Sequence, residues 1–348
     1  MTNLKGLSLF SGGGIGEMFL KDINIDVVVA NELIQKRASF YSYFHPKTKM
    51  FVGDIKKHYM EIIKEAKKSE IDFIIATPPC QGMSTLGKKD YENDLRNYLI
   101  YYVLEVLKNL DFKYCLIENV PKFLKMYYPY NNTLMHIDDI LKDQLGEKYV
   151  IESSILNVMD YGVPQCRPRS IIRIYKKNLS WDLPKKEKVI TLKEAIGDLP
   201  SLESGEASAI KYHYAPIHNE MHINVMKHTP EGKSAMQNKV YYPKKKNGEK
   251  VKGFHNTYKR MKWDEPCPTR ALNNGAISGH NNVHPGRLKS DGTYSDARVL
   301  SLLELFIVSS IPKDIIYPSD FSDNFIRQII GEGVPPLFIK KILSGIRR

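Results

Sequence analysis

Near its N-terminus the chain reads Gly6-Leu7-Ser8-Leu9-Phe10-Ser11-Gly12-Gly13-Gly14-Ile15-Gly16, an apolar strand that runs straight into a glycine-rich turn. Glycine tolerates the geometry of such a turn and lets the backbone approach a nucleotide-like ligand closely. A helical pattern follows at 15–21, and β-rich runs then alternate with helical patterns. Further strands are expected at 25–30, 73–76, 114–117, 149–156 and 169–175, and further helices at 33–43, 60–67, 98–107 and 134–145. This alternation predicts an α/β fold built on a doubly wound, mostly parallel sheet.

The pattern weakens after Trp181 into segments rich in proline, glycine, lysine and asparagine. Such a change is typical of a domain boundary, which we place near Pro184. The sequence therefore predicts a first domain at 1–184 and a smaller, irregular second domain at 185–299. Short helical patterns at 300–309 and 336–343 predict that the segment 300–348 returns to pack on the first domain.

The composition is that of an ordinary globular protein, with 42% hydrophobic and 26% charged residues in a chain of 348. The longest apolar runs, such as 25–30 and 302–308, are too short to cross a bilayer, and no signal-peptide pattern opens the chain. We therefore expect a cytoplasmic protein that does not contact a membrane.

Metal and disulfide chemistry are not expected from the cysteine and histidine pattern. The four cysteines, at 80, 115, 166 and 267, include no C-x-x-C pair, which argues against a zinc ribbon and a disulfide framework. His218 and His222 stand four residues apart, but two histidines alone rarely make a metal site. We expect reduced thiols and no bound metal.

The net charge of +12 suggests a polyanionic partner. Between Lys233 and Lys262 there are ten lysines and arginines against one acid, Glu249, with aromatic residues interleaved. This segment has the composition of a nucleic-acid surface. A solvated loop that carries lysines for solubility explains the same charge run and stays open as an alternative.

The glycine turn does not match the common nucleotide motifs. The residue three positions past Gly14 is Glu17 rather than glycine, and no G-K-[ST] follows, so NAD and ATP are disfavoured. A nucleoside cofactor without a pyrophosphate remains, of which S-adenosylmethionine is the common case. Glu32, after the second strand, suits ribose hydroxyls, and Asp54, in Gly53-Asp54-Ile55 at the end of a further strand, suits an adenine amine. A plain tight turn would explain the glycines about as well.

Two further motifs follow strands of the predicted sheet, and a third opens one. Thr77-Pro78-Pro79-Cys80-Gln81 places a thiol on a proline-set loop, where it is suited to act as a nucleophile, although many loop cysteines are simply buried. Glu118-Asn119-Val120 puts a carboxyl group at the same edge, suited to donate a proton or hydrogen bond to a ring nitrogen. Gln165-Cys166-Arg167-Pro168-Arg169 alternates polar side chains that suit a base carbonyl or a phosphate.

Taken together and in this order, these motifs resemble the DNA (cytosine-5) methyltransferases of the bacterial restriction-modification type. The likeness extends over almost the whole chain, and includes Glu265-Pro266-Cys267-Pro268-Thr269 and the helical pattern near 300–312. It implies the S-adenosylmethionine-dependent methyltransferase fold, with a catalytic and cofactor-binding domain at 1–184 and a target-recognition domain at 185–299. It also implies S-adenosylmethionine as cofactor, double-stranded DNA as substrate, a monomer, and a restriction endonuclease that acts separately.

The resemblance assigns roles to residues of this chain. Cys80 is expected to add to carbon 6 of a flipped-out cytosine while Glu118, protonated, holds N3 and Arg169 holds O2. The remaining assignments are Gln165, Arg167 and Asn119 as supports of the site; Phe10, Gly12, Gly14, Glu32, Leu33, Asp54, Ile55, Pro78, Leu99 and Val334 for the cofactor; and Gln81, Ser84, Lys88, Lys244, Lys245, Lys246 and Arg260 for DNA.

One departure keeps alternatives open. Gly331-Glu332-Gly333-Val334 stands where the family usually has Gly-Asn-small-Val, so an acid replaces an amide beside the expected cofactor. A catalytically silent DNA-binding homologue is therefore one alternative, and a tRNA cytosine-5 methyltransferase, which shares much of the motif set, is another. Amino-group methyltransferases are disfavoured, because they resemble an Asp/Asn-Pro-Pro-aromatic motif, whereas here Thr77 precedes the two prolines and Cys80 follows them.

Overall fold

The computed structural model describes residues 3–79, 95–238, 240–245, 247–253 and 255–347. Its internal contacts divide the chain into two compact units. The sheet unit comprises Met1–Asn157, Pro168–Lys186 and Phe338–Arg348, and the loop unit comprises Val158–Arg167 and Glu187–Leu337. Each unit is described by itself below.

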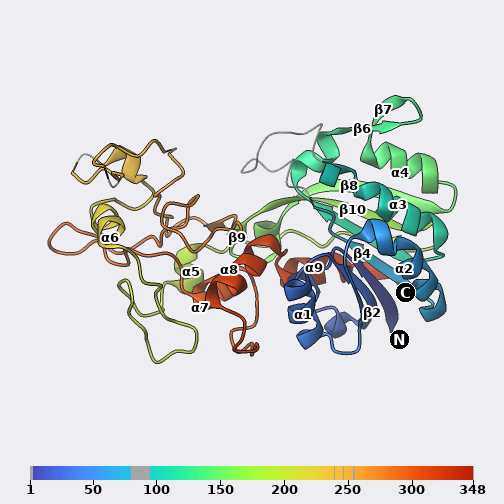
Figure 1. Ribbon diagram of the computed structural model, residues 1–348, viewed down its shortest axis with the longest axis horizontal. Helices are drawn as coiled ribbons and strands as arrows, with labels where there is room; N and C mark the ends of the chain where they lie inside the picture. Colours follow the sequence, from blue (N-terminus) through green and yellow to red (C-terminus); the bar gives the residue numbers. More distant parts are fainter. Residues whose placement is uncertain (1–2, 80–94, 239, 246, 254, 348) are drawn as a thin grey trace. The chain divides into compact units, whose positions relative to one another are not determined.

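The sheet unit is built on seven strands in the order β3-β2-β1-β4-β5-β10-β8 (Figure 1). The first five run parallel, and β10 is antiparallel to both of its neighbours. The strand bounds are β1 Leu4–Leu9, β2 Ile25–Glu32, β3 Lys49–Val52, β4 Phe73–Ala76, β5 Tyr114–Asn119, β8 Tyr149–Asn157 and β10 Pro168–Lys176. The predicted α/β fold with a mainly parallel sheet is confirmed.

Helices α2 (Ile55–Ser69), α3 (Ile100–Asn109) and α4 (Ile137–Leu145) lie side by side along the sheet (Figure 1). Each buries one apolar stripe in a core that also takes in residues of β1, β4 and β5. The remaining elements of this unit are α1 Gln35–Phe44, the 3-10 turns η1 Ile15–Glu17, η2 Lys21–Ile23, η3 Leu95–Tyr98 and η4 Pro121–Lys125, and the strands β6 Tyr127–Tyr130, β7 Thr133–His136, β11 Ser180–Trp181 and β13 Ile346–Arg347.

Two predicted elements of the first domain differ from the structure. The helix expected at 15–21 is replaced by the two turns η1 and η2, because the glycines that precede and interrupt it have poor helix propensity. The helix expected at 134–145 begins only at Ile137, since residues 133–136 form β7. The cause is the Asn131-Asn132 pair, whose positive φ angles of 46° and 61° close a tight hairpin between β6 and β7.

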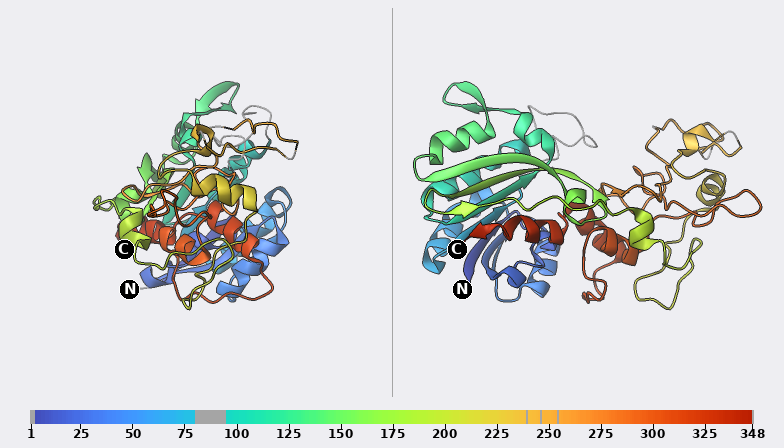
Figure 2. Two further views of the ribbon diagram at one scale, coloured as in Figure 1. Left: turned by 90° about the vertical axis from the view of Figure 1, so that its left-hand side faces the viewer. Right: turned by 180° about the vertical axis from the view of Figure 1, so that it is seen from behind.

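The loop unit has little regular structure, as expected for 185–299 (Figure 2). Its elements are α5 Leu192–Ile196, α6 Glu220–Lys227, α7 Leu302–Val308, α8 Asp323–Glu332, the turns η5 Val158–Tyr161 and η6 Ala235–Gln237, and the strands β9 Gln165–Cys166 and β12 Cys267–Pro268. Helix α9, Pro336–Leu343, begins in this unit and continues into the sheet unit.

The boundary between the two units does not coincide with the predicted boundary at residue 300. Residues 300–337, with α7 and α8, belong to the loop unit, and only 338–348 belong to the sheet unit. One reason lies in buried ion pairs: the guanidinium of Arg298 is 2.8 Å from Asp296 and 2.7 Å from Glu304 on α7. Burial disfavours charge on Glu304, but Arg298 overrides this and lowers the pKa of Glu304 to about 2. The start of α7 is thereby tied to the chain that precedes it.

Within the residues that the structure describes, no helix is both long and apolar enough to cross a membrane. Nor do those residues contain a group of three or more histidine, cysteine or acidic side chains placed to hold a metal ion.

Candidate active site

The C-terminal ends of β1, β4 and β5 form a connected edge in the sheet unit. Thr77, just after β4, donates from its hydroxyl to the carbonyl oxygen of Phe10 at 2.9 Å and from its backbone N–H to Leu9 at 3.1 Å. Asn119, at the end of β5, donates from its side chain to the carbonyl oxygen of Pro78 at 3.0 Å. The start of the Pro78-Pro79 loop is therefore held by both neighbouring strands, at the sheet edge where α/β proteins bind ligands.

A carboxylate and a guanidinium meet at this same edge. Glu118 on β5 and Arg169 on β10 are both nearly buried, and the Arg169 Nε atom is 2.8 Å from Glu118 Oε1. The antiparallel pairing of the two strands, which sets Glu118 opposite Ile171, brings Arg169 alongside. The pair can offer hydrogen-bond donors and an acceptor to one planar polar group.

Five of the predicted residues, Cys80, Gln81, Ser84, Lys88 and Lys246, lie outside the described residues. The thiols of the described chain are at Cys115, Cys166 and Cys267. Burial raises the pKa of Cys115, on β5, and also that of Cys267. Neither thiol is suited to act as a nucleophile, because a nucleophilic cysteine needs a lowered pKa and access to substrate.

The glycine turn after β1 is tied to the end of β2. Phe10, Gly12 and Gly14 all have left-handed backbone angles, with φ of 59°, 57° and 74°. The Glu32 carboxylate accepts from the N–H of Gly12 at 2.9 Å and from the N–H of Ile34 at 2.9 Å. A side chain at Gly14 would meet the ring of Tyr41 at 2.8 Å, so glycine is required there. At Gly12, in contrast, an added Cβ would meet open space.

The other predicted cofactor residues of the sheet unit differ in their environment. Leu33 is 62% exposed directly beyond Glu32, whereas Ile55 is buried in the core, so only its backbone can reach a ligand. Asp54 caps α2 by accepting from the N–H of Lys56 at 3.0 Å. Leu99 stands at the N-terminal end of α3 and packs partly against the core.

Two polar residues of this region were missed by the sequence analysis. Asn31, next to Glu32, donates to the carbonyl oxygens of Phe51 and Gly53 and joins the ends of β2 and β3. Glu17 is buried beside the glycine turn and accepts hydrogen bonds from the Ser8 hydroxyl and, at 2.6 Å, from the Tyr41 hydroxyl. Burial raises the pKa of Glu17 to about 7. Its position at the end of the apolar run 25–30, directly before Glu32, was the available signal for Asn31.

Gln165 and Arg167 are buried in the loop unit, where their side chains donate hydrogen bonds to backbone carbonyl groups. Gln165 donates to the carbonyl oxygen of Val308 at 3.1 Å. The Arg167 guanidinium donates to the carbonyl oxygens of Arg270 at 2.7 Å, Gly331 at 3.0 Å and Gly333 at 2.9 Å. Arg167 thus holds the backbone just before Val334. The Glu332 side chain, the departure from the family pattern, is exposed.

A family profile for C-5 cytosine-specific DNA methylases matches residues 4–348, almost the whole chain. The chain belongs to this DNA methylase family. It is 51% identical over 350 residues to the Type II methyltransferase M1.HgaI of Avibacterium volantium, across 99% of this chain and 98% of that one. It is 26% identical to the Type II methyltransferase M.DdeI of Desulfomicrobium norvegicum, across 98% of this chain and 88% of that one.

Solved structures give the same fold for this DNA methylase. A DNA modification methyltransferase encoded in an Escherichia coli prophage aligns with a TM-score of 0.71 at 20% identity, covering 99% of this chain and 98% of that one. A Spodoptera frugiperda DNMT2 structure aligns with a TM-score of 0.63 at 18% identity, covering 98% and 99%. The predicted activity of a DNA (cytosine-5) methyltransferase of the restriction-modification type is confirmed by the family and by the first relative, which do not favour the tRNA and silent alternatives.

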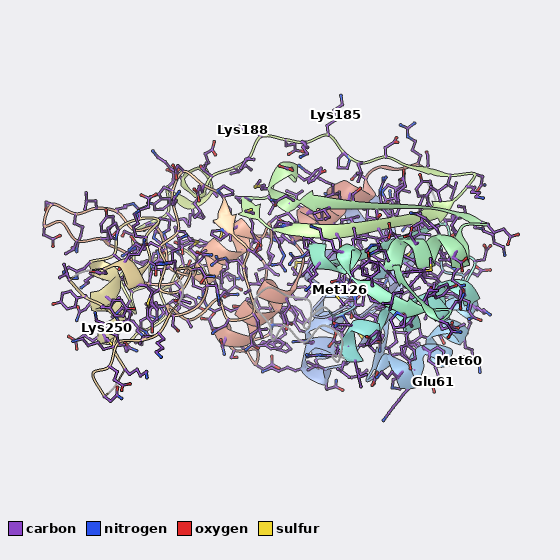
Figure 3. The ribbon with its side chains drawn as sticks, turned by 90° about the horizontal axis from the view of Figure 1, so that it is seen from above. Met60, Glu61, Met126, Lys185, Lys188 and Lys250 are labelled. Carbon is purple, nitrogen blue, oxygen red and sulfur yellow. The ribbon has the colours of Figure 1, made fainter. Side chains whose placement is uncertain are left out.

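The predicted DNA-binding residues in the loop unit of the methylase fall into two groups. Lys244 and Lys245 are exposed. The backbone of Lys244 forms an isolated antiparallel β-bridge with that of Lys250, which is labelled in Figure 3. Lys245 pairs with Glu249 at 2.9 Å, and the turn uses Gly248 at a φ of 83°. Lys246 lies outside the described residues.

The prediction that Arg260 binds DNA is wrong, because Arg260 is 0% exposed. Its guanidinium donates to the backbone carbonyl oxygens of Thr229 at 2.9 Å, Met226 at 3.0 Å and His284 at 2.8 Å. Burial lowers its pKa to about 10, so it remains charged at neutral pH. In a unit with few strands and helices, a planar guanidinium satisfies carbonyl groups that regular structure would otherwise pair.

Proposed function

We propose that this DNA methylase modifies carbon 5 of a flipped-out cytosine in double-stranded DNA, with Cys80 as nucleophile and with Glu118 and Arg169 holding the base. The observation that supports it most is the nearly buried Glu118–Arg169 pair, 2.8 Å apart, at the sheet edge. Asn119, next to Glu118, donates a hydrogen bond to the carbonyl oxygen of Pro78, two residues before Cys80 in the sequence. A stacked base is inaccessible to groups on both of its faces, so the cytosine has to leave the duplex.

The roles follow from the chemistry of the ring. The Cys80 thiolate forms a bond to carbon 6, and the displaced electron pair makes carbon 5 nucleophilic. Glu118, as the acid, shares its proton with N3, while Arg169 donates to O2. After carbon 5 has gained the methyl group, a base removes the carbon 5 proton and the Cys80 sulfur leaves, which restores the aromatic ring and the free thiolate.

The Glu118–Arg169 contact constrains this scheme. The Arg169 Nε atom is 2.8 Å from the Glu118 carboxyl group. We therefore expect Arg169 to turn from Glu118 toward O2 when the cytosine enters. Arg169 is then both the partner of Glu118 before binding and a ligand of the base after it.

We further propose S-adenosylmethionine as the cofactor, held at the glycine turn. When bound, it supplies the methyl group as an electrophile. The open space above Gly12, the carboxylate of Glu32 and the exposed apolar surface of Leu33 fit an adenosine group. Phe10, Gly14, Asp54, Ile55, Pro78, Leu99 and Val334 complete the proposed set.

Trapping the covalent step tests the nucleophile. Incubation with duplex DNA that carries 5-fluorocytosine and with S-adenosylmethionine should give a stable adduct, because fluorine at carbon 5 cannot leave as a proton does. Mass spectrometry should locate the adduct at Cys80, and Cys80→Ser should abolish it. Cys166→Ser, which removes a partly exposed thiol, is the matched control and should keep it. An adduct on another residue, or none from active enzyme, contradicts the assignment.

The lysine hairpin of the loop unit is the proposed target-recognition surface. Lys244 and Lys245 are exposed, and each lysine that neutralises a phosphate contributes about 0.9 to the slope of log affinity against log salt. The double variant Lys244→Ala/Lys245→Ala should therefore bind duplex DNA less tightly and with a slope smaller by roughly two. Fluorescence anisotropy at several salt concentrations measures this. An unchanged slope would place the DNA surface elsewhere.

The Type II relatives support a separate restriction endonuclease that recognises the same DNA sequence. We expect the methylase itself to act as a monomer. Bisulfite sequencing of DNA from a host that expresses this chain would identify the methylated cytosine and its flanking bases. Light scattering would give the oligomeric state of the protein.

A further inference from the structure

The turn between Asn238 and Tyr241 in the loop unit presents two side chains that the core of this unit does not use. Val240 is 71% exposed and Tyr241 is 45% exposed. Neither is part of the apolar cluster that this region buries around Met226 and Tyr258. Among the described residues the Tyr241 hydroxyl also has no hydrogen-bond partner. The turn therefore exposes an aromatic ring and a hydroxyl group that folding of the unit leaves unused.

Asn238 holds this turn in one conformation. Its Oδ1 atom accepts from the backbone N–H groups of Val240 at 2.8 Å and of Tyr241 at 3.1 Å. Its Nδ2 atom donates to the carbonyl oxygen of His228 at 3.1 Å and to the hydroxyl of Thr229 at 3.3 Å, just after α6. The backbone of Tyr241 is thus fixed before a partner binds, which lowers the entropy cost of binding.

The ring of Tyr241 is supported by His228. The two rings stack with centroids 4.5 Å apart and planes 26° apart. The His228 ring is itself oriented, because its Nδ1 atom lies 2.8 Å from the carbonyl oxygen of Asn224 and must donate to that acceptor. The stack restricts the Tyr241 ring while nearly half of the side chain stays exposed. The hydroxyl group is therefore carried on a supported ring and not on a freely rotating one.

The charge of the surrounding chain is positive. Between 227 and 259 the described residues include seven lysines against two acids, Glu231 and Glu249. Glu249 already pairs with Lys245 at 2.9 Å. Lys244, the exposed lysine next to that pair, has no carboxylate partner in the described part of the chain. Even if both acids neutralise a lysine, five positive charges remain, and a polyanion is the partner that they attract.

This segment offers a polyanion two kinds of contact. Lysines contact phosphates, which carry no base information. A tyrosine hydroxyl can donate and accept a hydrogen bond, so it suits the base edges that the major groove displays. The two kinds of contact are separated by anchored residues: the Tyr242 hydroxyl donates to the carbonyl oxygen of Val251 at 3.3 Å, and Pro243 is buried. Tyr241 and Lys244 can therefore act on one duplex in different ways.

We propose that Tyr241, supported by His228, is a specificity-determining residue whose hydroxyl group contacts a base edge in the recognition sequence. This inference rests on the proposed function, because it requires the surface of Lys244 and Lys245 to bind duplex DNA. Val240 adds an apolar contact beside the same base. The lysines then set the affinity for any duplex, and Tyr241 adds the preference for one sequence.

The test compares two affinities of the full-length protein, one for a duplex with the methylation site and one for a duplex in which the base pairs around the cytosine are permuted. Tyr241→Phe removes the hydroxyl and keeps the ring. It should lower the ratio of the two affinities roughly 3- to 10-fold, because only binding to the site weakens. The salt slope, which reports phosphate contacts, should stay the same. Methylation of duplexes with single base-pair changes should place the relaxed preference at one position.

The matched control is Tyr43→Phe, because Tyr43 on α1 is similarly exposed, at 47%. It should leave the affinity ratio unchanged. Thermal unfolding shows whether each variant is folded. An unchanged ratio in folded Tyr241→Phe overturns the proposal. So does an equal loss of affinity for both duplexes, since Tyr241 would then contact the backbone.

The lysine variant separates this inference from the proposed function. Lys244→Ala/Lys245→Ala should weaken binding to both duplexes equally and reduce the salt slope, with the affinity ratio preserved. If its slope does not change, the proposed DNA surface is wrong and the inference falls with it. If the lysine variant behaves as expected while Tyr241→Phe keeps the native ratio, only the inference about Tyr241 is rejected.

Discussion

Glu17 shows how a single buried residue makes stability depend on pH. Its pKa is raised from 4.5 to about 7 by burial, so the folded protein binds a proton that the unfolded chain releases between these values. The stability that this proton contributes is fully present below pH 4.5 and is lost as the pH rises through 7. A shift of this size corresponds to about 3 kcal/mol.

Glu17→Gln should remove that dependence while it keeps a hydrogen-bonding side chain between Ser8 and Tyr41. Urea unfolding at pH 5 and at pH 8 should show that the stability difference between the unchanged protein and the variant moves by about 3 kcal/mol in favour of the variant at the higher pH. Stability curves that stay parallel over this range would show that Glu17 titrates normally.

At the scale of one element, Asp54 combines two tasks at the start of α2. It caps the helix by accepting from the N–H of Lys56 at 3.0 Å, and it is proposed to hold the adenine amine. Asp54→Ala should cost about 1 kcal/mol of stability through the lost cap and should also weaken binding of S-adenosylmethionine. Ser322→Ala removes the equivalent cap of α8, where Ser322 accepts from Phe325, and should cost similar stability without loss of cofactor affinity. Calorimetric titration with S-adenosylmethionine separates the capping task from the cofactor-binding task. Equal cofactor affinity in the Asp54→Ala and Ser322→Ala variants would show that Asp54 only caps the helix.

At the scale of the whole molecule, the loop unit depends on buried charges in place of extended strands. Arg298 pairs with Asp296 and Glu304, and all three are buried. Arg298→Met leaves the buried Glu304 without its guanidinium and Asp296 with only the longer contact to Arg287 at 3.4 Å, and should destabilise the fold by about 3–5 kcal/mol. Arg347→Ala breaks an exposed pair with Asp182 and should cost less than about 1 kcal/mol. Thermal unfolding measures both; similar melting temperatures would show that the buried network contributes little.

Much of the sheet unit was predictable because local signals and tertiary structure agree there. The order of strands and helices follows from hydrophobic periodicity, and the expected active-site residues follow from polar groups placed at strand ends. The exceptions have local causes in the structure: the glycines at the first turn prevent a regular helix, and Asn131-Asn132 starts a hairpin inside an apparent helical pattern. The loop unit was described by the sequence only as irregular, since its buried contacts link residues that are far apart in the chain.

The amino-acid order alone determines the α/β class, the glycine turn and the positions of the motifs that we propose to be catalytic, because these depend on side-chain period and on residues adjacent in the chain. Only the tertiary structure decided which charges face water. Arg260 reads as a surface cation, but it donates to backbone carbonyls from three separate segments, at Met226 and Thr229, at His284 and at Asp296. Arg169 meets Glu118 only because β10 runs antiparallel to β5. Burial and ion pairing depend on groups brought together by the fold, and no local pattern records them.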